Sequence, residues 1–166
     1  GTLLFDISNP ENPDLLSLIE GENVWTVHFF DDYLYVGDQS SLNISIIITD
    51  FFDEFLTVSN VLNINLSNSI KDIETGHYGD YIFVALGSDG VVLIDYNEAD
   101  NTYDMLGEYN TSALANKIDF FDDALFAQRI AVSDWDDVEI LEWNGSNLDL
   151  VGFKNTTRRT MGISTK

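Results

Sequence analysis

Few of the residue types that carry catalysis occur in this chain. It has no cysteine and two histidines, His28 and His77, and it lacks the Gly-x-Ser-x-Gly, His-Glu-x-x-His, phosphate-loop and dinucleotide-binding motifs. Two acidic doublets, Asp31-Asp32 and Asp122-Asp123, have the composition of paired carboxylates for acid–base chemistry. An aspartate in a turn also accepts hydrogen bonds from nearby backbone, which explains the doublets better. We therefore predict no catalytic residue.

Two short segments collect the oxygen ligands that calcium prefers. The first contains Asn97, Asp100 and Asp104, and the second contains Asp134, Asp136 and Asp137. Neither segment has the Asp-x-Asp/Asn-x-Asp/Asn-Gly order that wraps a calcium ion. Solvated turns are the preferred interpretation, so no metal and no cofactor is predicted, with calcium kept as the alternative.

Five Asn-x-Ser/Thr motifs make N-glycosylation the most informative candidate modification. The asparagines are Asn43, Asn65, Asn110, Asn144 and Asn155. Three of them, Asn65, Asn110 and Asn155, are 45 residues apart, so they mark one position in three repeated units. We expect all five in loops that carry glycans; the alternative is that Asn and Thr simply form these turns.

Aromatic side chains offer a second kind of contact. Trp135 lies in the second acidic segment and Trp143 at the end of an apolar run, so both are expected to be partly exposed contact residues. Trp25 is expected to pack between repeated units instead.

The composition narrows the classes of partner. The 166 residues carry 29 acidic and 7 basic side chains, a formal net charge of −22, which argues against nucleic acid as a partner. Hydrophobic residues make up 45% and aromatic residues 13%, too many for a disordered acidic chain. No apolar run approaches the roughly 20 residues of a membrane span. The expected partners are other protein chains or surface polymers, including further copies of the chain in an oligomer or filament.

The elements that hold these residues follow an internal repeat of about 45 residues. Four apolar runs each end in an acidic residue, and these acids are Asp6, Asp50, Asp95 and Glu142. Successive acids are 44, 45 and 47 residues apart. A second series is spaced 46, 45 and 45 residues apart, namely Val27, Ile73, Ile118 and Ile163. The runs are short, rich in β-branched and aromatic residues, and separated by Asp, Asn, Gly and Ser, which predicts four strands in each unit.

Four strands in about 45 residues are typical of a blade of a β-propeller. We therefore predict an all-β fold with four-stranded antiparallel blades. Residues 1–166 form one partial propeller domain, in which 1–23 supply the two outer strands of a first blade, 24–68, 69–114 and 115–157 are blades, and 158–166 supply the inner strand of the next. Fifteen strands make about 3.75 blades, too few for closure, so a piece of a longer chain is expected.

The opening segment Leu3-Leu4-Phe5-Asp6-Ile7-Ser8-Asn9-Pro10-Glu11-Asn12-Pro13-Asp14-Leu15-Leu16 resembles the repeat of LVIVD-type β-propellers. In that family a hydrophobic strand ends in Asp-Val/Ile-Ser-Asn/Asp-Pro-x-x-Pro. The later repeats keep the apolar run and the acid but lose the prolines, as in Asp95-Tyr96-Asn97. The resemblance implies an extracellular or surface location and no assigned reaction.

These observations lead to a non-catalytic extracellular propeller that serves as a structural or binding module. The first alternative is a propeller enzyme, a hydrolase or lyase on extracellular polymers, whose site is completed by blades outside this segment. A convergent cluster of Asp, His and Arg at the entrances of the inner strands would favour it. The second alternative is a calcium-dependent adhesion module, which calcium would stabilise against heat.

Overall fold

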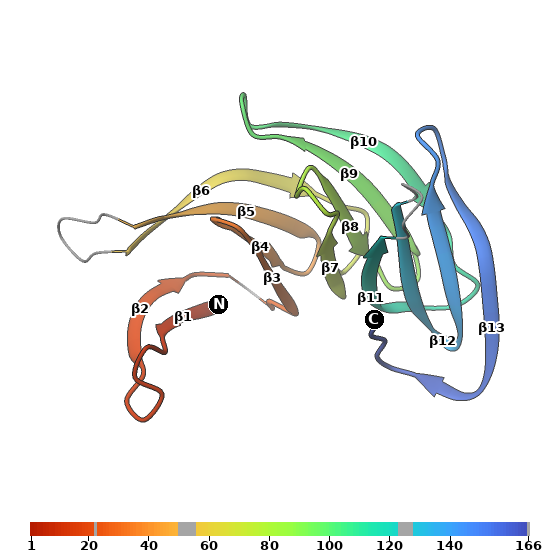
Figure 1. Ribbon diagram of the computed structural model, residues 1–166, viewed down its shortest axis with the longest axis horizontal. Helices are drawn as coiled ribbons and strands as arrows, with labels where there is room; N and C mark the ends of the chain where they lie inside the picture. The colour runs from red at the N-terminus through yellow and green to blue at the C-terminus, as the bar shows by residue number, and fades with distance from the viewer. Residues whose placement is uncertain (22, 50–55, 123–127, 166) are drawn as a thin grey trace.

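A computed structural model describes residues 1–21, 23–49, 56–122 and 128–165 (Figure 1). Over these ranges the chain forms strands and turns and no helix. Accordingly, no helix long and apolar enough to cross a membrane is found among them. The strands assemble into four antiparallel sheets, which confirms the predicted all-β class.

Each sheet is built from strands that are consecutive in the chain. The N-terminal hairpin pairs β1 (Thr2–Asp6) with β2 (Asp14–Ile19). The next sheet has the order β3 (Thr26–Phe30), β4 (Tyr33–Gly37), β5 (Ser41–Thr49), β6 (Leu56–Asn65). The third has β7 (Asp72–Thr75), β8 (Tyr81–Ala85), β9 (Val91–Asn97), β10 (Thr102–Tyr109). The fourth has β11 (Ala115–Asp122), β12 (Gln128–Trp143), β13 (Leu148–Thr160).

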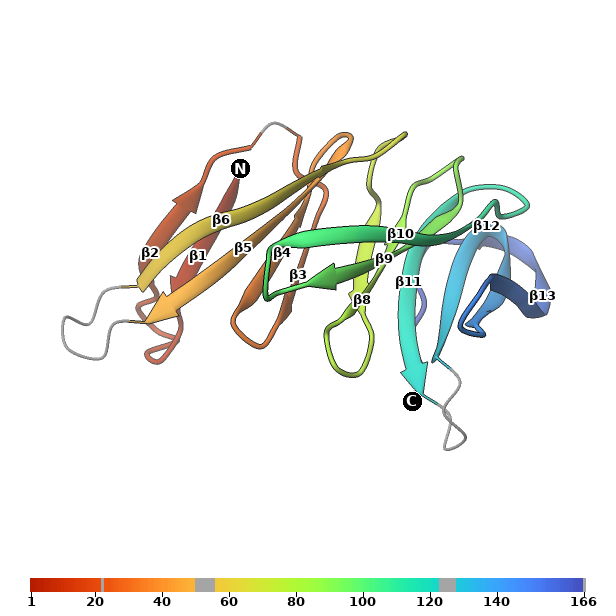
Figure 2. The ribbon, with the colours of Figure 1, turned by 90° about the horizontal axis from the view of Figure 1, so that it is seen from above.

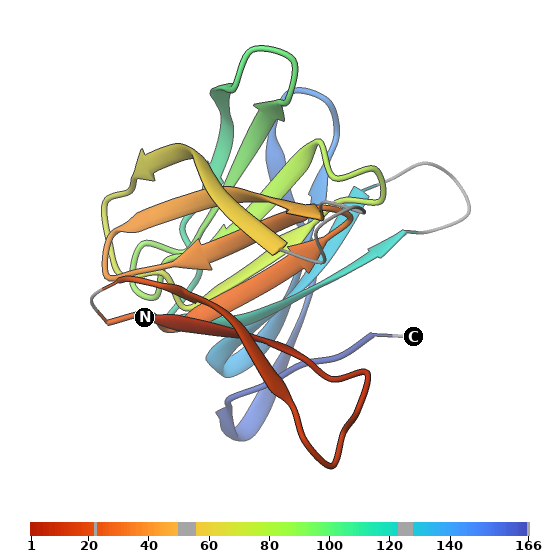
Figure 3. The same cartoon turned by 90° about the vertical axis from the view of Figure 1, so that its left-hand side faces the viewer.

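The apolar core lies between consecutive sheets, because strand alternation sends successive side chains to opposite faces. On β8, Ile82 and Val84 join the core shared with the β3–β6 sheet, whereas Phe83 joins the core shared with the β11–β13 sheet. The β7–β10 sheet is thus covered on both faces. A smaller core, in which Leu4 and Ile19 pack near Ile47, joins the N-terminal hairpin to the β3–β6 sheet. In Figure 3 the hairpin lies in front of this sheet.

The element β12 is a hairpin of two arms. Arg129 Nη2 and Glu142 Oε2 are 2.6 Å apart, although 13 residues of straight strand would separate them by about 43 Å. The chain therefore reverses near Trp135, whose φ is 52°. The first arm pairs with β11 and the second with β13, so this sheet has four strand segments side by side (Figure 1). The sequence predicted two strands, over 124–130 and 136–142, with a loop between them; residues 124–127 lie outside the described residues.

The sheets are arranged radially. The first strands of successive sheets contact one another, β3 against β7 and β7 against β11. They lie on the concave side of the molecule near both termini, while β6, β10 and β13 lie on the convex side (Figure 1). Seen from above, the sheets follow one another along the long axis (Figure 2). The fold is a partial β-propeller with β3, β7 and β11 as inner strands.

One predicted strand does not form. An inner strand was expected over 159–164, but β13 extends to Thr160 and residues 161–165 are not in a strand. The segment still lies beside β11, because the hydroxyl of Thr165 donates to Asp119 Oδ2 at 2.5 Å. Among the described residues no strand of the next sheet lies beside residues 161–165, so their backbone has no partner for a ladder of hydrogen bonds.

Candidate active site

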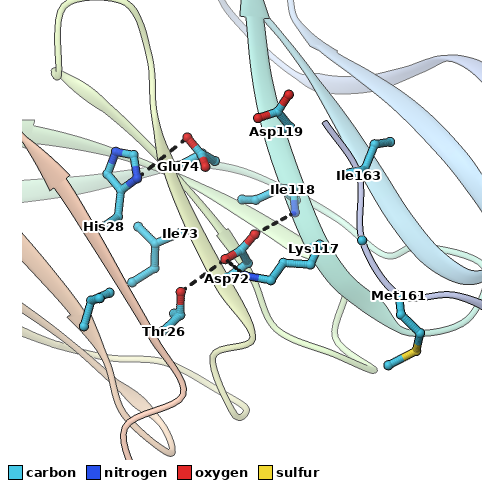
Figure 4. Close-up of a pocket in the computed structure, with 12 residues that line it drawn as sticks. Thr26, His28, Asp72, Ile73, Glu74, Lys117, Ile118, Asp119, Met161 and Ile163 are labelled. Atoms are coloured by element: carbon cyan, nitrogen blue, oxygen red, sulfur yellow. Dashed lines mark hydrogen bonds and ion pairs between the residues drawn. The ribbon is translucent and has the colours of Figure 1, made fainter. Parts of the chain in front are cut away.

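The inner strands enclose a pocket of about 350 Å³ (Figure 4). Its titratable side chains come from three sheets: His28 from β3, Asp72 and Glu74 from β7, and Lys117 and Asp119 from β11. The segment after β13 closes one side of the pocket with Met161 and Ile163. Acidic, basic and imidazole groups therefore converge where the inner strands meet.

Strand alternation and the repeat explain this convergence. Residues two apart in a strand point to the same face, so Asp72 and Glu74 share the pocket face of β7. Ile73, between them, is almost fully buried in the core. The repeated apolar position is Val27, Ile73 or Ile118. The residue before it is Thr26, Asp72 or Lys117, and the residue after it is His28, Glu74 or Asp119.

Asp72 ties the three inner strands together. Its Oδ1 accepts hydrogen bonds from Lys117 Nζ at 2.6 Å and from Thr26 Oγ1 at 3.1 Å. Its Oδ2 accepts one from the backbone N–H of Ile118 at 3.0 Å. Asp72 is only 5% exposed, and a buried carboxylate is tolerated because donors and a cation surround it. The pair fixes the position of the Lys117 ammonium group at the pocket.

Glu74 is the group best suited to exchange a proton near neutral pH. Burial, with smaller contributions from Asp72 and Asp119, raises its pKa from 4.5 to about 7, against the opposing effect of Lys117. A carboxyl group with this pKa is present in both protonation states at pH 7, as general acid–base catalysis requires.

His28 lies beside Glu74. Its Nδ1 is 3.7 Å from Glu74 Oε2, and its Nε2 is 3.0 Å from the hydroxyl oxygen of Thr75. Burial lowers the pKa of His28 below its ordinary value, although Asp72 acts in the opposite direction. The imidazole is therefore neutral at pH 7, held by two neighbours on β7. A proton-exchanging carboxyl, a neutral imidazole and an ammonium group together can activate water and stabilise developing negative charge.

This cluster was not predicted from the sequence, where Val27, Ile73 and Ile118 were recognised only as a repeated apolar position. The residues on either side of that position are charged or hydrogen-bonding in every inner strand, which is the signal that identifies the cluster. The histidines alone gave no signal, because His77 lies after β7 and is exposed.

The predicted calcium segments have different outcomes. Asn97 and Asp100 accept hydrogen bonds from the backbone of Ala99 and Thr102 in an exposed turn, and Asp104 is exposed on β10, which agrees with solvated positions. In the second segment, Asp134 and Asp137 are buried together with Glu139, whereas Asp136 is exposed and outside the group.

Glycosylation of the five asparagines stays a prediction, but three of them lie in strands and not in the expected loops. Asn43 lies in β5, where its Oδ1 accepts a hydrogen bond from Asn63, and Asn155 lies in β13 opposite Asp137. Asn65 is the last residue of β6 and pairs with Ser41. These strands are longer than the apolar pattern indicated. Asn110 follows β10 and Asn144 lies in the turn before β13, and both are exposed, as are Asn65 and Asn155.

Trp135 and Trp143 are partly exposed, as expected, whereas the expectation for Trp25 was wrong. Trp25 does not pack between sheets: it is 65% exposed, with Lys71 Nζ 4.6 Å from its ring. Trp135 is partly buried beneath the guanidinium of Arg159, at 4.3 Å, and Trp143 packs against the core of the fourth sheet. Among the acidic doublets, Asp31 occupies the β3–β4 turn with a φ of 49°, and the doublet at Asp122-Asp123 lies outside the described side chains.

Comparisons with known proteins bear on the fold. No family model and no curated protein matches the chain. Its fold is similar to a crystal structure from Bacteroides fragilis provisionally named a 6-phosphogluconolactonase, with a TM-score of 0.69 and 12% sequence identity. The match covers 90% of this chain and 43% of the other, so the chain spans less than half the length of that protein.

This comparison corrects the expectation of a non-catalytic structural or binding module. The similar structure is named as an enzyme, and a convergent cluster lies at the inner strands. It contains the Asp and His expected for the enzyme alternative, with Lys117 as the cation in place of an arginine. The expectation failed because the cluster joins residues from three repeats, none of which is unusual by itself.

Proposed function

We propose that the inner-strand pocket is the acid–base site of a hydrolase that opens a lactone, an internal carboxylic ester. The observation that carries the proposal is the pairing of Glu74, with a pKa of about 7, with a neutral His28 beside a fixed Lys117 ammonium group. The similar structure, named for a sugar lactone, supports the choice of bond.

Each side chain has a role in the proposed reaction. The Glu74 carboxylate removes a proton from water as the water oxygen bonds to the lactone carbonyl carbon. The Lys117 ammonium stabilises the negative charge that develops on the carbonyl oxygen. When the ring C–O bond breaks, Glu74 returns the proton to the departing alkoxide, which yields a hydroxy acid. His28 has a hydrogen bond with Thr75 and lies 3.7 Å from Glu74, so it forms a wall of the pocket beside the carboxyl group.

The charge of the pocket selects the substrate class. Three carboxyl groups, on Asp72, Glu74 and Asp119, face one ammonium group on Lys117, and the whole chain is strongly acidic. A phosphorylated substrate would meet repulsion in such a pocket. We therefore assign a neutral, polyhydroxylated lactone rather than the phosphorylated one in the name of the similar structure.

The test is hydrolysis of glucono-1,5-lactone and its 6-phosphate by the purified protein, corrected for the spontaneous rate. Glu74→Gln should lower kcat by about 10²–10⁴-fold, because it removes the proton acceptor without changing the shape of the side chain. Glu108→Gln, on the exposed face of β10, is the matched control and should keep full activity. Equal rates for wild type and Glu74→Gln would reject the assignment, and faster hydrolysis of the phosphate ester would reject the substrate class.

The LVIVD-type resemblance and an extracellular location belong to the same proposal. They are supported by the segment from Leu3 to Leu16 and by the five Asn-x-Ser/Thr motifs. A hydrolase outside the cell would act on lactones from its surroundings. Intact-mass analysis of protein from its natural source, before and after glycosidase treatment, measures the glycans directly.

A further inference from the structure

A second polar cluster lies away from the inner strands, at the turn of the β12 hairpin. Asp134, Asp137 and Glu139 each offer a carboxylate oxygen, and these atoms lie within 4.8 Å of one another. The three residues are 0%, 6% and 3% exposed. Buried carboxylates this close repel one another unless donors or a cation compensate their charge.

The donors present compensate only half of the cluster. Asp134 Oδ2 accepts hydrogen bonds from Ser112 Oγ at 2.9 Å and from the backbone N–H of Ala113 at 2.8 Å. Ser112 also donates to Asp137 Oδ2 at 3.3 Å, through its hydroxyl, and to Glu139 Oε1 at 3.4 Å, through its backbone N–H. All of these donors belong to the loop between β10 and β11.

The other oxygen of each carboxylate is buried without a hydrogen-bond partner: Asp134 Oδ1, Asp137 Oδ1 and Glu139 Oε2. Thr111 precedes Ser112 in the chain, and Ser133 precedes Asp134. The hydroxyl oxygens of Thr111 and Ser133 are also buried without a hydrogen-bond partner. Such atoms are rare in folded proteins, and an ion is one of their few explanations.

We propose that Asp134, Asp137 and Glu139 form a calcium site. The ligand atoms are all oxygens, three of them from carboxylates, and this set suits a hard divalent cation rather than zinc. Two oxygens bound to one calcium ion at about 2.3–2.6 Å can lie up to about 5 Å apart, whereas magnesium, at about 2.0–2.1 Å, limits them to about 4 Å. The three carboxylate oxygens lie within 4.8 Å of one another, which is within the separation that calcium accommodates.

The ion would join two sheets. Asp134, Asp137 and Glu139 belong to the fourth sheet, and Ser112 and Ala113, which hold them, lie in the connection from the third. Calcium therefore fastens the β12 turn to the loop after β10. Because it binds the folded chain and compensates buried charge, it stabilises this end of the propeller.

The test compares chelator-treated protein with calcium chloride or magnesium chloride added, by calorimetric titration and thermal unfolding. Calcium at about 100 times its Kd should raise the midpoint of unfolding by about 5–10 °C, and magnesium should bind at least tenfold more weakly. Asp137→Asn and Glu139→Gln should abolish the calcium shift. Each should also raise the midpoint of the metal-free protein, because it removes one of three buried, mutually repelling charges.

Asp136→Asn is the matched control, because Asp136 is an exposed carboxylate in the same turn, and it should leave calcium binding unchanged. Terbium luminescence excited through Trp135 gives a measurement on wild-type protein alone, so the test does not depend on folding of the variants. Absence of terbium emission and of a calcium shift in wild type would overturn the proposal. So would a calcium shift that survives in both cluster variants.

Discussion

At the residue scale, one repeated position supplies the chemistry of the pocket by changing its side chain from repeat to repeat. The position before Val27, Ile73 and Ile118 is Thr26, Asp72 and Lys117 in turn. Thr26 and Lys117 both donate hydrogen bonds to Asp72. A perfectly repeated sequence would place like charges together here. The divergence of the repeats is therefore what turns a structural position into a site.

Asp72→Ala tests this position. The substitution removes the partner of Lys117 and leaves the buried N–H of Ile118 without an acceptor, so we expect unfolding free energy to fall by about 2–4 kcal/mol. Urea unfolding at pH 7 measures the change. Asp104→Ala, at an exposed position of β10, should change it by less than about 0.5 kcal/mol. A loss for Asp72→Ala no larger than that of the control would show that the network does not hold the inner strands.

The sequence predicted two of the three residues of the acidic cluster, Asp134 and Asp137. Asp134 and Asp137 were named from their spacing, and Asp136 was included with them although its side chain is exposed. Glu139 was missed because it lies on the second arm of the β12 hairpin, and the turn of that hairpin brings it to the cluster. There it accepts a hydrogen bond from Ser112, which lies in the loop after β10. Neither contact is visible in a local sequence pattern.

At the element scale, turn chemistry was the most predictable feature. The sequence Gly87-Ser88-Asp89-Gly90 is typical of a hairpin turn, and it joins β8 to β9 with a hydrogen bond from the N–H of Leu86 to the carbonyl of Gly90. Both glycines have positive φ, at 61° and 73°. Strand lengths were less predictable, because pairing extends β13 beyond its apolar run, through Asn155 to Thr160.

Gly90→Ala should be strongly destabilising. A Cβ atom at Gly90 would lie 2.1 Å from the carbonyl oxygen of Tyr109, in addition to the cost of a positive φ, so a loss of about 2–5 kcal/mol is expected. Gly145→Ala separates the two effects, because its φ is 90° and nothing lies within 4 Å of the added atom. Its loss should be about 1–2 kcal/mol. Equal losses in urea unfolding would contradict the close approach of Tyr109 to this turn.

At the scale of the whole molecule, the 45-residue period was sufficient to predict the architecture. Core residues such as Ile73 and Ile118 recur at one position, and a unit of four strands can bury both faces only against its neighbours. The function was not predictable in the same way. Glu74, His28 and Lys117 come from three repeats. The burial that shifts the pKa values of Glu74 and His28 exists only once the sheets are assembled.

The dependence of kcat/KM on pH for glucono-1,5-lactone tests the central claim most directly. Glu74 must be ionised to accept a proton from water, and its pKa is about 7, so activity should rise with pH through about 7 and then level. An unshifted glutamate, with a pKa of 4.5, would leave the profile flat between pH 6 and 8. In Glu74→Gln the residual activity should lose this inflection. A flat wild-type profile across that range, or an inflection near pH 7 that persists in Glu74→Gln, would contradict the account.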